Sequence, residues 1–249
     1  MFEKQFSDAG FHFSDITINN SSSVIGTNLG FAQFDGSTLS HIAGNEPIIA
    51  APQVISITPD NKLIMANERG ISLSGWANLS IRAYSVGFST QLNLEQSPIN
   101  LGNRVSRMIL GKDGNVYMGL IHSTSAGIVA LDVSNGIKVH KLYFPKTQLT
   151  EDEVFIVSGI ALDGKDNIWS TSDNNYNQPL SVFNGSLSRH FSINESGGIL
   201  SNSSNAIAAD NFNRIWIGSP SGLLMYKYSG DVMDPTSEIW IEESVDPGM

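Results

Sequence analysis

The chain has 249 residues, of which 41% are hydrophobic and only 15% are charged, so it can bury a core and is not disordered by composition. Acidic residues outnumber basic residues by 24 to 14, and the net charge of -10 repels phosphate backbones and anionic lipid heads, which argues against nucleic acid as a partner. Cysteine is absent from the sequence, which excludes disulfides, thiolate metal sites and cysteine nucleophiles.

The hydrophobic residues are not gathered into long runs. No run approaches the ~20 apolar residues that a membrane helix needs, and the N-terminal residues contain no apolar segment of signal-peptide length. We therefore expect a soluble chain without membrane insertion, placed in the cytoplasm or in a virion.

A pattern of short strands separated by polar turns recurs five times along the chain. The copies span approximately residues 11–45, 46–97, 98–146, 147–198 and 199–243. Aligned on their second strands, they place Ile25, Ile64, Tyr117, Trp169 and Trp216 at one equivalent position, at intervals of 39, 53, 52 and 47 residues. Repeats of about 40 to 50 residues with several short strands each are typical of β-propeller blades.

The repeat predicts an all-β fold, a five-bladed β-propeller of four-stranded antiparallel blades, with six blades as the alternative. Residues 1–249 are expected to form a single domain, with residues 1–10 adding a strand that closes the ring. One blade cannot bury both faces of its sheet, so we expect the aromatic residues at the equivalent position to pack between neighbouring blades. Trp240, on a late strand, is a candidate contact for another subunit.

The fifth copy carries a more specific pattern. Asp210 is followed by Trp216, by Gly218 and Ser219, and then by Gly222 and Tyr226. This copy resembles the propeller repeat of two-component regulators, and the general rhythm is similar to that of streptogramin-lyase and NHL-type propellers. The resemblance implies the propeller fold. It does not imply the regulators' signalling role, because the kinase and membrane helix of those proteins have no counterpart in the sequence.

Candidate catalytic and metal-binding groups are scattered. The five histidines are spread over three of the copies, with no pair at metal-ligand spacing. The segments 112–115 and 163–167 faintly resemble calcium loops, but they lack the downstream bidentate glutamate and are interpreted as hairpin turns. The predicted innermost strands carry no paired carboxylates, only Asp15 at a margin, which argues against a glycosidase. No catalytic residues, metal or cofactor are therefore predicted.

Two longer connections between second and third strands, at residues 120–126 and 172–179, are the candidate binding site. They are expected on one face of adjacent blades, with Glu68 and Arg69 flanking them, and loops of this kind commonly carry the binding residues of a propeller. A tyrosine among Asn and Asp residues is typical of surfaces that bind proteins or sugars. The predicted binding residues are His122, Asp173, Asn174, Asn175, Tyr176, Glu68 and Arg69.

The absence of clustered catalytic groups favours a non-enzymatic binding or assembly module with a protein or glycan partner. The composition suits a phage or virus structural component, an adhesin or a lectin-like protein, as a homo-oligomer or within a larger assembly. The alternative is a propeller enzyme, a lyase or hydrolase that acts at the tunnel mouth, in which His122 would be the only histidine in a loop between second and third strands.

Overall fold

Most of the chain that the structure describes is β-strand. The computed structural model describes residues 13–19, 22–27, 30–34, 37, 39–43, 54–58, 62–67, 70–75, 91–94, 97–100, 105–123, 127–134, 138–143, 155–172, 178–196, 204, 206–220 and 222–243. The chain divides into two compact units, residues 1–90 and 91–249. Each unit is described by itself.

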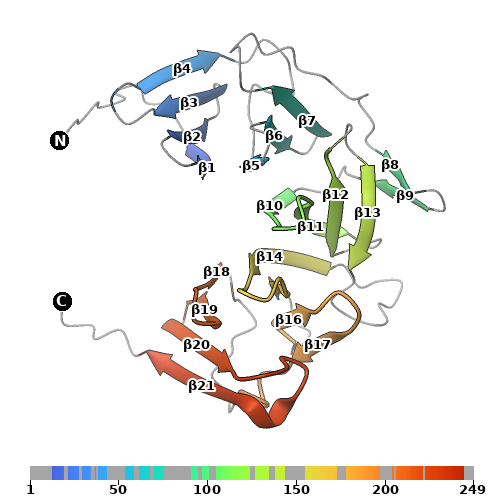
Figure 1. The fold of residues 1–249 in the computed structure, drawn as a ribbon, viewed down its shortest axis with the longest axis vertical. Coiled ribbons are helices and arrows are strands. Elements are labelled where there is room, and N and C mark those ends of the chain that lie inside the picture. The colour runs from blue at the N-terminus through green and yellow to red at the C-terminus, as the bar shows by residue number, and fades with distance from the viewer. Residues whose placement is uncertain are drawn as a thin grey trace. The chain divides into compact units, whose positions relative to one another are not determined.

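The first unit contains two antiparallel sheets. Sheet 1 has the order β1 (Phe13–Asn19), β2 (Ser22–Thr27), β3 (Gly30–Phe34) and β4 (Leu39–Ala43), and sheet 2 has the order β5 (Val54–Ile57), β6 (Lys62–Asn67) and β7 (Gly70–Gly75) (Figure 1). The first strands of these two sheets are linked by a hydrogen bond from the Ile55 amide to Asp15 Oδ2, at 3.0 Å. The expected ring-closing strand at residues 1–10 and the expected fourth strand of the second copy lie outside the described residues.

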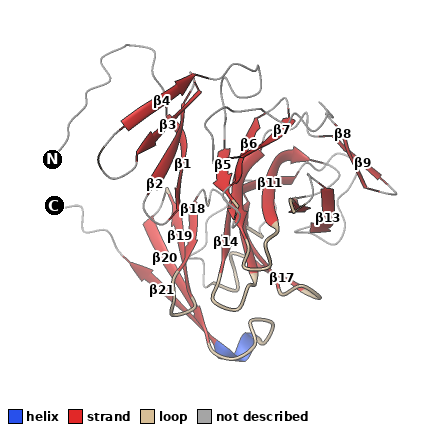
Figure 2. Cartoon of the chain, turned by 45° about the horizontal axis from the view of Figure 1, so that its top comes forward, coloured by secondary structure: helices blue, strands red, loops and turns tan. Residues whose placement is uncertain are grey.

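The second unit contains an eight-stranded antiparallel sheet, whose two four-stranded halves we call sheets 3 and 4, and a four-stranded antiparallel sheet, which we call sheet 5. Sheet 3 comprises β10 (Val105–Leu110), β11 (Val116–Ser123), β12 (Ile128–Asp132) and β13 (Lys138–Tyr143); sheet 4 comprises β14 (Phe155–Leu162), β15 (Ile168–Ser172), β16 (Leu180–Phe183) and β17 (Ser188–Phe191); sheet 5 comprises β18 (Ala206–Ala209), β19 (Arg214–Ser219), β20 (Gly222–Tyr228) and β21 (Glu238–Glu243). A hairpin of β8 (Gln91–Leu94) and β9 (Ser97–Asn100), which the repeat did not predict, precedes them, and the short 3-10 helix η1 (Pro235–Ser237) is the one helical element among the described residues (Figure 2).

The first hairpin turn of each sheet in this unit is built around an aspartate. Asp163 Oδ1 accepts hydrogen bonds from the Lys165 and Asn167 amides, at 2.9 and 3.0 Å, which holds the tight connection between β14 and β15. Left-handed backbone at Asp166, with φ of 63°, completes this turn, and Asp and Asn tolerate that conformation better than most residues. The segment that resembled a calcium loop therefore uses its carboxylate to hold the turn.

The aromatic residue of the second strand occupies equivalent positions in the strand pairing of the three sheets. Tyr117 is opposite Ile109, Trp169 is opposite Ala161, and Trp216 is opposite Ala208. The equivalence predicted from the repeat is therefore confirmed for these sheets.

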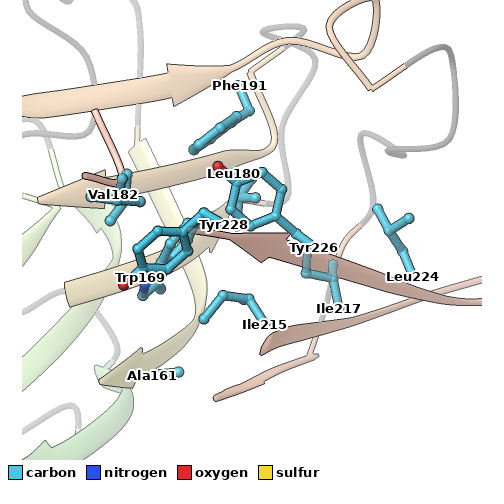
Figure 3. Close-up of a cluster of buried hydrophobic side chains, with 11 residues drawn as sticks. Ala161, Trp169, Leu180, Val182, Phe191, Ile215, Ile217, Leu224, Tyr226 and Tyr228 are labelled. Carbon is cyan, nitrogen blue, oxygen red and sulfur yellow. The ribbon is translucent and has the colours of Figure 1, made fainter. Parts of the chain in front are cut away.

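Trp169 packs between sheets 4 and 5, as expected of the aromatic position. Its indole is fully buried and lies against Phe191 of its own sheet and Tyr226 and Tyr228 of sheet 5, with ring centroids 5.3 to 6.1 Å away (Figure 3). Burying an aromatic side chain of this kind removes ~150–250 Å² from water and contributes ~4–6 kcal/mol. Trp240 packs on Tyr226, with the ring centroids 4.5 Å apart, and its role as a contact for another subunit stays a prediction.

A second cluster joins sheets 3 and 4. Tyr117, Ile128 and Ala130 of sheet 3 pack with residues of sheet 4 that include Val157 and Ile160. Trp216 of sheet 5 differs from the other two aromatics, because it is only half-buried and lies outside both clusters. Packing between sheets is thus shown for Tyr117 and Trp169.

Candidate functional site

We call the end of sheets 3 and 4 at which β11 and β15 finish and β10 and β14 begin the loop end, and the predicted connections at residues 120–126 and 172–179 start there in the chain. His122 belongs to β11, but its side chain is not among those the structure describes. The remaining predicted residues lie outside the described residues: Asp173, Asn174, Asn175, Tyr176, Glu68 and Arg69. Their role in binding stays a prediction.

The connection expected at residues 120–126 is partly strand, which corrects the placement of His122. Strand β11 continues to Ser123, and its last residues pair antiparallel with the start of β14, Ile121 with Ile156 and Ser123 with Phe155. The pairing of β11 with β10 stops at Leu120 and Val105, so β11 extends beyond the start of β10. The remaining backbone groups of β11 pair with β14. His122 lies at the register shift between the two new pairs, where a bulge can redirect a side chain.

The first strands of sheets 3 and 4 each contain a bulge at a serine near the loop end. The register shifts between Val105 and Arg107 in β10, and between Val157 and Gly159 in β14, so Ser106 and Ser158 are the extra residues. Both serines follow a valine that precedes the aromatic position by the same number of residues. Bulges are common beside functional sites because they aim side chains away from the regular pleat.

Ser158 links sheet 4 to the segment that leads into sheet 5. Its Oγ donates to the carbonyl oxygen of Ser204 at 2.6 Å and lies 3.0 Å from Thr171 Oγ1. The next residue must be glycine for this approach, because a Cβ on Gly159 would come within 2.9 Å of both Ile207 Cγ2 and Thr171 Oγ1. The bulge therefore brings β14 and β18 close together near the loop end.

The chemistry offered by these first strands is hydrogen bonding. Arg107 is exposed on β10 and Ala206 and Ala208 are exposed on β18, while Ser106 and Ser158 are half-buried. Across the residues described in β10, β14 and β18 there is no carboxylate and no histidine to act as a general acid or base.

The carboxylates of the hairpin turns accept hydrogen bonds that stabilise the fold. Burial would raise the pKa of Asp163, but hydrogen bonds from Trp169, Tyr228, Asn167 and the Lys165 amide outweigh it and lower that pKa. Burial first, and then the hydrogen bond and charge of Asp163, raise the pKa of Tyr228. At neutral pH the Asp163 carboxylate is therefore ionised and the Tyr228 hydroxyl is neutral.

Asp210, the equivalent residue in sheet 5, behaves in the same way. Burial would raise its pKa, but hydrogen bonds from Trp216, the Phe212 amide and Arg214 lower it to about 2. Within the described part of the chain, no three His, Asp or Glu side chains gather closely enough to hold a metal ion. No helical segment of that part has the length and hydropathy of a membrane span.

Sequence reasoning did not identify the two bulged serines or Ser204. A signal was present, because Val105-Ser106 and Val157-Ser158 recur at the same offset before Tyr117 and Trp169. The side chains were overlooked because an isolated serine in a strand carries no chemical signature until its neighbours are known.

The comparisons with known proteins bear on the fold. No protein-family model matches the sequence, and a search of curated proteins finds no relative. Solved structures do match. Virginiamycin B lyase from Staphylococcus aureus aligns with a TM-score of 0.65 and 14% sequence identity over 94% of this chain and 71% of that one. A catalytically inactive variant of that lyase, solved with quinupristin, aligns with a TM-score of 0.67 and 13% identity over 98% and 74% of the two chains.

Two proteins of other kinds match as well. The extracellular domain of a hybrid two-component system from B. thetaiotaomicron aligns with a TM-score of 0.61 and 16% identity over 95% of this chain and 29% of that one. A gluconolactonase from Xanthomonas campestris aligns with a TM-score of 0.53 and 12% identity over 83% and 68%.

The chain has a β-propeller fold. The resemblance predicted from the repeat, to the propellers of two-component regulators and of streptogramin lyases, is confirmed at the level of structure. Matches of such low identity show the fold alone, and the number of blades stays a prediction.

Proposed function

We propose that this propeller is a non-enzymatic binding module that holds a protein or glycan partner at the loop end of sheets 3 and 4. The observation that carries the proposal is the distribution of ionisable groups. Asp113, Asp163 and Asp210 are used by hairpin turns and aromatic partners, and the described first strands of sheets 3, 4 and 5 present hydroxyl, guanidinium and apolar groups instead of an acid and a base.

The chemistry at this end supports binding. Hydroxyl and amide side chains make several weak, directional hydrogen bonds, and one aromatic ring among them supplies apolar contact area. The acidic and Asn- and Ser-rich composition suits a structural or adhesion component of a phage or virus, which is the setting we propose.

The test is a glycan array and a pull-down screen with the intact chain, repeated with Tyr176→Ala and Asn175→Ala. Leu187→Ala is the matched control, because Leu187 is exposed in the turn between β16 and β17, at the opposite end of sheet 4. We expect both loop variants to weaken binding about tenfold or more while the control binds as the wild type does. Unchanged affinity of both variants for every detected partner would refute the site.

An enzyme is the second candidate, favoured by the register shift that places His122 beside the β11–β14 pairing. The solved neighbours include a lyase and a gluconolactonase, so quinupristin and gluconolactone are rational first probes. Liquid chromatography with mass spectrometry would follow the loss of each compound. Turnover by the wild type that is abolished by His122→Ala would replace the binding proposal with an enzymatic one.

A further inference from the structure

Buried polar atoms without hydrogen-bond partners are concentrated at one interface. Within the described part of the chain, five buried side-chain atoms lack a partner: Ser106 Oγ, Ser170 Oγ, Ser172 Oγ, His190 Nε2 and Trp240 Nε1. The first four lie between sheets 3 and 4. We call these four residues the polar seam.

Strand pairing places Ser170 and His190 of the polar seam on one face of sheet 4. Ile160 is opposite Ser170, Ser170 is opposite Ser181, and Ser181 is opposite His190. Side chains directly opposite on paired strands point to the same face. Ile160 belongs to the cluster that packs on Tyr117 and Ile128, so this face is turned toward sheet 3.

Ser172 lies two residues beyond Ser170 on β15 and therefore on the same face. It is opposite Val157, another member of the cluster shared with sheet 3. Ser170 and Ser172 are only 1% and 2% exposed, so neither hydroxyl is in contact with bulk solvent.

Ser106 approaches the same interface from sheet 3. The position that a Cβ on Gly119 would take lies 2.7 Å from Ser106 Oγ and 2.7 Å from Val157 Cγ1, which shows that the serine hydroxyl and the valine of sheet 4 come together there. At the corresponding place between sheets 4 and 5, the bulged Ser158 meets Ser204 and donates to its carbonyl oxygen. Ser106 Oγ, unlike Ser158 Oγ, has no protein partner.

Four such atoms are too costly to remain unpaired in a stable domain. One buried polar atom without a partner lowers the folding equilibrium constant about fivefold to a hundredfold. Buried polar groups in folded proteins that lack protein partners are generally satisfied by ordered water. Residues two apart on a strand are separated by about 6.6 Å, a span that two hydrogen-bonded water molecules can bridge between two hydroxyls.

We propose that the polar seam is a buried hydration site, in which ordered water molecules bind Ser106, Ser170 and Ser172 through Oγ and His190 through Nε2. His190 Nδ1 already lies 2.9 Å from Ser181 Oγ, so Nε2 is the ring nitrogen that forms a hydrogen bond with water. The interface of sheets 3 and 4 is therefore partly wet, whereas that of sheets 4 and 5 is bound by direct contacts between aromatic side chains.

Chemical unfolding of the intact chain with Ser170→Ala and Ser172→Ala tests the proposal. If water satisfies the hydroxyls, each substitution removes hydrogen bonds and lowers the folding constant about fivefold. Ser181→Ala is the control for the loss of a hydroxyl whose partner is a protein group, and we expect a fall of similar size. A folding constant that stays unchanged or rises in both Ser170→Ala and Ser172→Ala would overturn the proposal.

A high-resolution crystal structure of the wild type provides a readout that does not depend on the variants. We expect water oxygens within about 3.2 Å of Ser170 Oγ and Ser172 Oγ. Protein groups in those places, or no density beside either hydroxyl, would equally overturn the proposal. The loop variants of the binding test lie elsewhere on the chain, so the two proposals can fail independently.

Discussion

Asp163 is the residue whose removal should most sharply test how the sheets are joined. The carboxylate is only 3% exposed. Its Oδ2 accepts from Trp169 Nε1 at 2.8 Å, from the Tyr228 hydroxyl at 2.7 Å and from Asn167 Nδ2 at 2.9 Å. Its Oδ1 accepts from two backbone amides of the turn. One side chain thus connects the β14–β15 turn, the buried indole and sheet 5.

The loss in the free energy of unfolding caused by Asp163→Ala follows from these hydrogen bonds. A buried donor left without a partner costs ~1–3 kcal/mol, and hydrogen bonds to a charged group are at the upper end of the range. Tyr228 and Asn167 remain 3.0 Å apart and can still bond to each other, whereas the indole of Trp169 and the turn amides lose their acceptor. Because such losses are not additive, we expect a total of ~3–5 kcal/mol, a large share of the 5–15 kcal/mol typical of a domain.

Urea unfolding followed by tryptophan fluorescence measures this free energy. Asp210→Ala is the matched control, since Asp210 has the equivalent position in sheet 5 and bonds Trp216 Nε1 at 3.1 Å, but its side chain is 24% exposed and water can replace it. We expect the control to cost ~1 kcal/mol. Equal effects of the two substitutions, or a loss below ~1 kcal/mol for Asp163→Ala, would refute the reasoning.

The Asp163 carboxylate also makes the stability of the folded protein depend on pH. The pKa of Asp163 is lowered in the folded protein below its ordinary value of 3.8, so the unfolded chain takes up a proton first as the pH falls. The stabilisation is therefore present above about pH 4 and is lost as the pH falls through the folded-state pKa. Asp163→Ala should lose this part of the acid sensitivity.

Two further predictions concern the interfaces of sheet 4. Trp169→Ala should destabilise the chain by ~3–5 kcal/mol because it leaves a cavity among packed rings. Trp216 is only half-buried, so Trp216→Ala should destabilise the chain less. Similar urea midpoints for the two variants would contradict this prediction. Burial lowers the pKa of His190, and its ring faces Phe183 and Ser181 while Arg189 lies on the opposite face of the sheet. The unfolded chain therefore binds the proton more readily, and stability should fall as the pH drops below the ordinary histidine value of 6.5. His190→Gln should flatten the difference between unfolding midpoints at about pH 7.5 and about pH 5.5, and an unchanged difference would exclude His190 as its source.

The strands and their register were predictable because the signals that set them are local. Alternating apolar residues, the Asp and Asn turns and the recurring aromatic position mark each hairpin within a few dozen residues, as Asp210 and Trp216 show in sheet 5. The hairpin β8–β9 was missed because it breaks the repeat and has no counterpart in the other copies.

The candidate site was predictable only in outline. The loop end of sheets 3 and 4 follows from two long connections, but the extension of β11 onto β14 does not, because Ile121 and Ile156 are far apart in the sequence and a strand's partner depends on which neighbour leaves backbone groups unpaired.

By itself, the sequence determined that the chain is all-β, that its hairpins repeat and that one aromatic position per repeat is equivalent, since alternation and turn chemistry act over a few residues. Only the tertiary structure decided that Asp163 bonds Tyr228, that Ser158 meets Ser204 and that Ser106 meets Val157. Those contacts depend on how neighbouring sheets approach each other, and burial and hydrogen bonding between distant residues leave no local mark in the chain.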